Sequence, residues 1–163
     1  MKRIRSRRGQ AALSVSIVAL AMLTAGASSA GAAPNAVSKT FSLIAKSNSK
    51  TTTLVNVDSL LINARCSPTG SPVIFAFSSA TSADLFGRIF DGFGRLHIVR
   101  NSSFTKTSKG EQLSTNSGDF DGTGTLLFET STGKVVTVNY AFDNSTTLSK
   151  QDVCTVYGSL IAS

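Results

Sequence analysis

The two cysteines constrain the fold of this chain most, because each lies in a run of alternating apolar residues. In residues 60–66 every second residue is apolar and the series ends at Cys66, while Cys154 belongs to a similar run over 152–161. Such alternation is typical of a strand with one buried face. Both cysteines therefore face the interior, and the sequence predicts one disulfide, Cys66–Cys154, through a β core.

The first 33 residues have the organisation of a cleaved signal peptide. Five basic residues stand within the first eight, a mostly apolar segment follows over 11–25, and small residues then offer cleavage sites between Ala30 and Ala33. The apolar segment, about 15 residues long, is shorter than the roughly 20 that a membrane-spanning helix needs. We expect a signal helix over residues 1–33, a single secreted domain over 34–163, and no transmembrane segment in the mature chain.

The leader also indicates the compartment. Its basic start resembles a bacterial export signal, and the Arg7–Arg8 pair leaves the twin-arginine route open beside the general one. We expect a secreted, extracellular or cell-envelope protein. An oxidising compartment of that kind favours disulfide formation, in agreement with the cysteine pattern.

Removing the leader changes the charge of the chain. The full sequence has 16 Lys and Arg against 9 Asp and Glu, but residues 1–33 hold five of the basic residues and none of the acids. The mature chain therefore has 11 basic and 9 acidic side chains and a net charge near neutral. Without a basic stripe, we expect no nucleic acid among its partners.

Short β-type segments separated by turn residues recur about every 8–12 residues after the leader. We expect strands at 39–45, 51–57, 60–66, 73–77, 84–90, 95–100, 111–114, 125–130, 134–142 and 152–161. The sequence thus predicts an all-β fold of about eight to ten short antiparallel strands. Both a β-sandwich and a small β-barrel agree with this pattern.

Residues 84–90 fit two structures. Leu85, Phe86, Ile89 and Phe90 have helical spacing, but Gly87 disfavours a helix and the neighbouring segments are β-like, so we favour a strand.

The phenylalanines Phe86, Phe90 and Phe93 can be interpreted in two ways. Because the chain has no tryptophan, we favour the interpretation that they fill the core. Alternatively, they form a surface that contacts a partner, a lipid or an apolar ligand.

Residues 116–124 hold three glycines and two aspartates and predict a loop. Asp119, Asp121 and Thr123 occupy positions 1, 3 and 5 of a weak calcium-loop pattern, but the closing glutamate is missing at position 12. A solvated turn is the better interpretation. We expect neither a metal nor another cofactor.

The sequence contains no clear motif of catalytic residues. His97 is the single histidine and lies in an expected strand, where a surface or half-buried position is usual. Four acids, Asp84, Asp91, Glu111 and Glu129, could converge in space as a glycosidase pair would, but the sequence alone does not bring them together. We expect no enzyme. The sequence favours a secreted, non-catalytic binding or structural module, and the alternative is a small β-barrel that carries an apolar ligand.

Overall fold

Antiparallel strands form the regular structure of this chain in the computed structural model, which describes residues 36–115, 121–144 and 153–163. These residues all belong to one compact unit that spans 32–163. The strands are β1 (Val37–Lys46), β2 (Thr52–Val57), β3 (Leu60–Cys66), β4 (Pro72–Ser78), β5 (Ala83–Asp91), β6 (Leu96–Asn101), β7 (Glu111–Gln112), β8 (Gly122–Thr130), β9 (Val135–Asn144) and β10 (Val153–Ala162). The all-β prediction is confirmed.

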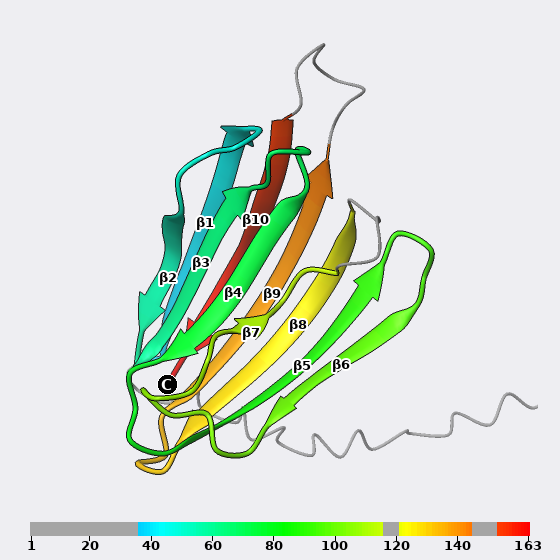
Figure 1. The fold of residues 1–163 in the computed structure, drawn as a ribbon. Coiled ribbons are helices and arrows are strands. Elements are labelled where there is room, and N and C mark those ends of the chain that lie inside the picture. Colours follow the sequence, from blue (N-terminus) through cyan, green and yellow to red (C-terminus); the bar gives the residue numbers. More distant parts are fainter. Residues whose placement is uncertain (1–35, 116–120, 145–152) are drawn as a thin grey trace, which may run out of the picture. The chain divides into compact units, whose positions relative to one another are not determined.

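The strands form two antiparallel sheets that pack face to face (Figure 1). The larger sheet has six strands in the order β1-β10-β9-β8-β5-β6, and the smaller has four in the order β2-β3-β4-β7. Across the layers, β3 contacts β1 and β10, while β4 contacts β10 and β9. The architecture is a β-sandwich.

Alternation of side chains places the core between the two sheets. In β3 the residues Leu60, Ile62 and Ala64 are buried, and the residues between them are half-buried. Strand β8 alternates in the same way, with Leu126 and Phe128 fully buried. The packed interior is apolar, which supplies the main driving force for folding.

The ambiguous segment at 84–90 is a strand. In β5 every second residue, including Leu85 and Ile89, is buried, and Phe86 and Phe90 are exposed on the opposite face. Pairs at i, i+1, i+4 and i+5 fit a helix stripe, but they also fit two opposite faces of one strand. The surrounding β structure decides between these two arrangements.

The predicted loop over 116–124 is wrong at its C-terminal end. Strand β8 begins at Gly122 and pairs Gly122 with Asp91 of β5 and with Phe142 of β9. The glycines that indicated a loop serve close packing instead, because the ring of Tyr140 lies against Gly124 where a side chain would stand.

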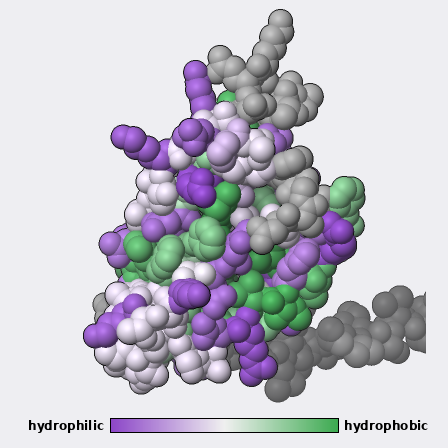
Figure 2. Space-filling view, viewed as in Figure 1, coloured by the Kyte–Doolittle hydropathy of each residue, from purple (hydrophilic) through white to green (hydrophobic). Residues whose placement is uncertain are grey.

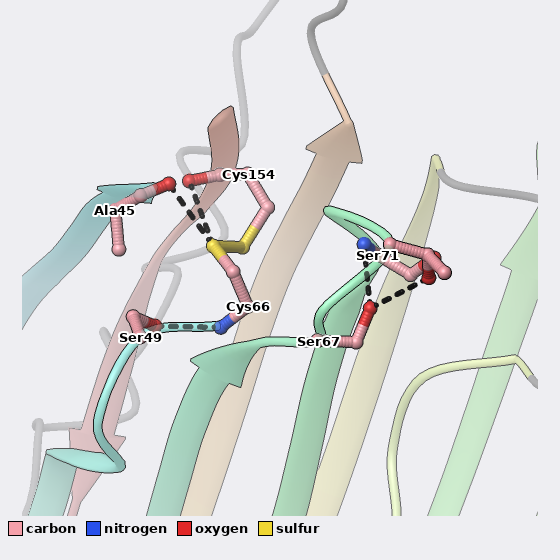
Figure 3. The surroundings of a disulfide bond; sticks show 7 residues. Ala45, Ser49, Cys66, Ser67, Ser71 and Cys154 are labelled. Atoms are coloured by element: carbon pink, nitrogen blue, oxygen red, sulfur yellow. Dashed lines mark hydrogen bonds between the residues drawn. A yellow bond between two sulfur atoms is a disulfide. The ribbon is translucent and has the colours of Figure 1, made fainter. Parts of the chain in front are cut away.

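One disulfide links the two sheets. Cys66 ends β3 of the smaller sheet, Cys154 is the second residue of β10 in the larger one, and their α-carbons lie 5.7 Å apart (Figure 3). Both cysteines are fully buried. The Cys66 amide donates a hydrogen bond to Ser49 Oγ at 2.8 Å, and Cys66 Sγ lies 3.1 Å from the Ala45 carbonyl oxygen. The predicted pairing is confirmed.

Within the three ranges that the structure describes, no helix has the length and apolar character needed to cross a membrane.

Candidate functional site

The outer face of the six-stranded sheet, meaning the face turned away from the four-stranded sheet, carries an unusual number of exposed apolar side chains. The inward positions of its strands are buried or half-buried, and the exposed large residues occupy the alternate positions. Those on the outer face are Ile44, Phe86, Phe90, Leu96, Ile98, Leu127, Tyr157 and Ile161. Large exposed apolar side chains gathered on one face of a sheet point to a binding face.

Strand register aligns the outward residues in three rows that run across the sheet. The first row is Leu96, Phe90, Thr123, Ala141, Tyr157 and Ser42. The second is Ile98, Arg88, Thr125, Asn139, Ser159 and Thr40. The third is Arg100, Phe86, Leu127, Thr137, Ile161 and Ser38. A mainly polar second row therefore lies between two rows that contain aromatic and aliphatic side chains.

At one end of these rows lies a group that we name the apolar corner. It comprises Phe86, Phe90, Leu96, Ile98 and Leu127, from β5, β6 and β8. Figure 2 shows apolar surface over β5 and β6 also in the view onto the four-stranded sheet.

The expectation that Phe86, Phe90 and Phe93 fill the core is wrong, because all three are exposed. Phe86 is 37% exposed, Phe90 46% and Phe93 76%. The guanidinium of Arg88 lies 5.6 Å from the Phe86 ring centroid, and that of Arg95 lies 5.1 Å from the Phe93 centroid. Arginine over an aromatic face is a common element of binding surfaces.

The turn that presents Phe93 is held by a buried carboxylate. Asp91 Oδ1 accepts hydrogen bonds from the backbone N–H groups of Phe93 and Arg95, at 3.1 and 2.8 Å. Asp91 Oδ2 accepts from Arg95 Nε at 2.6 Å and lies 3.0 Å from His97 Nε2. These contacts fix the β5–β6 turn and therefore the position of Phe93.

The environment of Asp91 changes its acidity. Burial alone would raise the pKa of this carboxyl group. The hydrogen bonds from His97 and from the backbone and side chain of Arg95, together with the Arg95 charge, outweigh burial and hold the pKa well below its usual range. Asp91 thus remains ionised, which suits an anchor of the turn.

The candidate acids and the histidine form separate pairs in the fold and do not all meet at one place. His97 is half-buried in β6, as the sequence predicts, and contacts Asp91. Asp84 and Glu129 are direct cross-strand partners on the exposed outer face, and Glu111 accepts a hydrogen bond from Asn101 at 2.7 Å. The structure therefore brings together two pairs, Asp91 with His97 and Asp84 with Glu129.

A surface hollow of about 700 Å³ lies over β1, β10 and β9, at the other end of the rows. Six of its lining residues point outward by register: Thr40, Ser42, Asn139, Ala141, Tyr157 and Ser159. The other three, Phe41, Tyr140 and Gly158, lie between them in the same strands. Tyr157, 54% exposed, is the large outward side chain of this hollow.

The weak calcium pattern is only partly visible. Asp119 lies outside the described residues, Asp121 is exposed, and Thr123 is exposed within β8. Across the described ranges, no group of three or more His, Cys, Asp or Glu side chains is arranged to hold a metal ion.

Sequence reasoning missed most of this face. Leu96, Ile98, Leu127, Tyr157 and Ile161 each alternate with inward residues, so the pattern assigns them to one face of a strand. The rows that these residues form across the sheet depend on the order of the strands, which the sequence does not show.

Comparisons of this chain with protein-family models, with curated proteins and with solved structures gave no match, so its role has to be argued from its own geometry.

Proposed function

We propose that this protein is an exported, non-catalytic binding module that contacts a cell-envelope or extracellular partner through the outer face of its six-stranded sheet. The observation that carries the proposal is the concentration of eight exposed large apolar residues on that one face. The inner apolar faces of the two sheets already cover each other. The outer apolar face remains in water, and a partner that covers it would gain binding free energy from removing that apolar surface from water.

The composition of the apolar corner supports a role in contact. Its aromatic rings, together with Arg88 and Arg100 in the adjoining positions of the rows, match the residue types that contribute most to binding interfaces. The buried disulfide and the leader-like first 33 residues support an oxidising compartment outside the cytoplasm.

The alternative, a barrel that carries an apolar ligand, gains no support from the geometry. A carrier encloses its ligand within a closed sheet, whereas this chain forms two separate sheets. The hollow of about 700 Å³ opens on the outside of the larger sheet.

A sedimentation assay tests the proposal. The purified exported protein is mixed with washed cells of the source organism, and the fraction that sediments with the cells is measured. We expect the wild type to bind and the Phe86→Ser/Phe90→Ser double variant to lose at least tenfold in affinity, because truncating central apolar anchors costs about 2 kcal/mol or more.

Val37→Ser provides the control, since Val37 is 41% exposed at the end of β1 and lies outside the rows. Equal binding by the wild type and the double variant would contradict the role of the apolar corner. No sedimentation of the wild type would contradict the proposed function itself.

A further inference from the structure

The second row of the outer face is a polar trough. Starting from β1, its first four residues are Thr40, Ser159, Asn139 and Thr125, all exposed and uncharged, and Thr125 Oγ1 donates to Asn139 Oδ1 at 2.9 Å. The first charged residue is Arg88, on β5. Short hydroxyl and amide groups therefore run across four strands without a charge.

At two of its strands, β10 and β5, larger side chains flank this trough on both sides. On β10 the outward neighbours of Ser159 are Tyr157 and Ile161, and on β5 those of Arg88 are Phe86 and Phe90. The hollow of about 700 Å³ widens the trough over β1, β10 and β9. Over β1, β10 and β9 the outer face thus offers a depression lined by hydroxyl and amide groups, with the exposed side chain of Tyr157 beside them.

We propose that this trough binds a linear, uncharged polysaccharide that lies across the strands. The inference rests on the proposed binding function and names the chemical class of its partner. Adjacent strands lie about 4.8 Å apart, so the four strands that carry the uncharged stretch give the ligand a path of roughly 14 Å. A path of that length accommodates several units of a polymer.

The chemistry of the trough matches a sugar chain. Serine and threonine hydroxyls and the asparagine amide both donate and accept hydrogen bonds, as the hydroxyl groups of a polysaccharide also do. The exposed ring of Tyr157 offers a flat apolar surface for the C–H face of a sugar ring, and its hydroxyl offers a polar end. The absence of charge from Thr40 to Thr125 complements an uncharged ligand.

Other ligand classes fit less well. An extended peptide pairs with the edge of a sheet and would not lie across its face. A nucleic acid needs several cations along its path, whereas Arg88 is the one charged residue of this row. A lipid surface needs contiguous apolar area, which this face offers only at the apolar corner, because Thr125, Asn139, Ser159 and Thr40 separate the first and third rows over the other strands.

Affinity gel electrophoresis with a panel of neutral linear polysaccharides (xylan, mannan, a β-1,3-glucan, hydroxyethylcellulose and a soluble chitin derivative) tests the inference. We expect at least one polysaccharide to retard the exported protein, and Tyr157→Ala and Asn139→Ala each to weaken that retardation at least tenfold. Tyr157→Phe keeps the ring and should retain most of the binding.

Asn56→Ala is the matched control for Asn139→Ala, because Asn56 is an exposed asparagine of β2 in the other sheet. It should leave retardation unchanged. Retardation that all variants share equally would overturn the inference, as would no retardation by any member of the panel.

Chemical acetylation of tyrosine gives a second measurement. The chain has two tyrosines, and Tyr140 is buried with its hydroxyl donating to the Leu113 carbonyl oxygen at 2.7 Å. Acetylation should therefore modify Tyr157 selectively, and the retarding polysaccharide should protect it. Unprotected Tyr157 at a saturating polysaccharide concentration would contradict the proposed site.

The two proposals fail separately. If Phe86→Ser/Phe90→Ser abolishes cell binding but no polysaccharide retards the wild type, the binding function stands and the sugar ligand is wrong. Binding to vesicles of anionic phospholipid, without polysaccharide binding, would assign the face to a membrane and overturn the sugar ligand in the same way. If the wild type does not bind cells at all, the proposed function fails as well.

Discussion

The two sheets of this sandwich differ in how far their outward apolar side chains are exposed. On the four-stranded sheet the outward apolar residues of β3 and β4, which include Phe75 and Phe77, are half-buried. On the six-stranded sheet the corresponding residues, such as Phe86 and Phe90, are exposed. The chain itself therefore covers the apolar outward residues of the smaller sheet and leaves those of the larger sheet exposed to solvent.

The cover on the smaller sheet comes from the segment after β6. Gly110 lies directly against the Phe77 ring, in space that a side chain would need. Earlier in the same segment, Phe104 is fully buried, packs edge-on to Phe128 with ring centroids 6.2 Å apart, and its backbone N–H donates to the Ala83 carbonyl oxygen. One connecting segment therefore contributes to the core and also shields an outer face.

The largest expected effect is on the link between the two sheets. Cys66 and Cys154 are 88 residues apart in the sequence, and replacing both by serine removes the constraint that the disulfide places on the unfolded chain. The chain-entropy model then gives a decrease in the free energy of unfolding of about 4.5 kcal/mol at most. Because domains of this size have a net stability of only about 5–15 kcal/mol, urea unfolding should show a large drop in midpoint. An unchanged midpoint would mean that the sheets hold together without the disulfide.

The same substitution at two adjacent leucines of β8 allows the inner and outer faces of the larger sheet to be compared. Leu126 is fully buried, and Leu126→Ala should lower the free energy of unfolding by about 2–5 kcal/mol. Leu127 is 41% exposed, and Leu127→Ala should cost about 0.5 kcal/mol or less. Chemical denaturation of both variants measures the difference, and equal losses would contradict the assignment of the two faces.

The positions of the strands could be predicted well, because the alternation of apolar and polar residues that identifies a strand lies within the segment itself. The run from Leu60 to Cys66 alternates so regularly that its limits and its buried face follow from sequence. At Gly122–Gly124 the same reasoning fails, because glycine indicates a loop when its partners are unknown. Here the glycines accommodate Phe142 and Tyr140, which are distant in sequence.

Only some residues of the candidate site could be predicted, because the site also depends on contacts between residues that are distant in sequence. The sequence indicates Phe86, Phe90 and Phe93 as a possible contact surface but cannot distinguish an outer face from the core. Tyr157 gives no signal by itself, since the hollow that it lines also needs Ser159 and Asn139 from the adjacent row. Strand order, which depends on pairing between distant segments, carries that information.

A smaller effect compares the two outer faces directly. Phe77→Ala should lower stability by about 1–2 kcal/mol, a part of the 3–5 kcal/mol typical of a fully buried phenylalanine, because Phe77 is half-buried. Phe90→Ala should cost about 0.5 kcal/mol, because Phe90 is 46% exposed. If Phe90→Ala proves the more costly in thermal unfolding, the outer face of the larger sheet contributes to folding rather than being reserved for a partner.

The smallest effect is confined to acid and concerns the turn that presents Phe93. The pKa of Asp91 is held below its usual range in the folded state, so its contribution to stability is fully present above the ordinary aspartate value of about 3.9 and is lost as the pH falls toward the folded value. Asp91→Asn removes the charge that Arg95 and His97 contact. Thermal unfolding between pH 7 and pH 2 should therefore show a variant that is less stable at pH 7 and has a flatter acid dependence than the wild type. Asp84→Asn, at an exposed position of the same strand, should leave the wild-type profile nearly unchanged. If Asp91→Asn and the wild type give parallel profiles, the carboxylate does not anchor the turn, and the fixed presentation of Phe93 needs another cause.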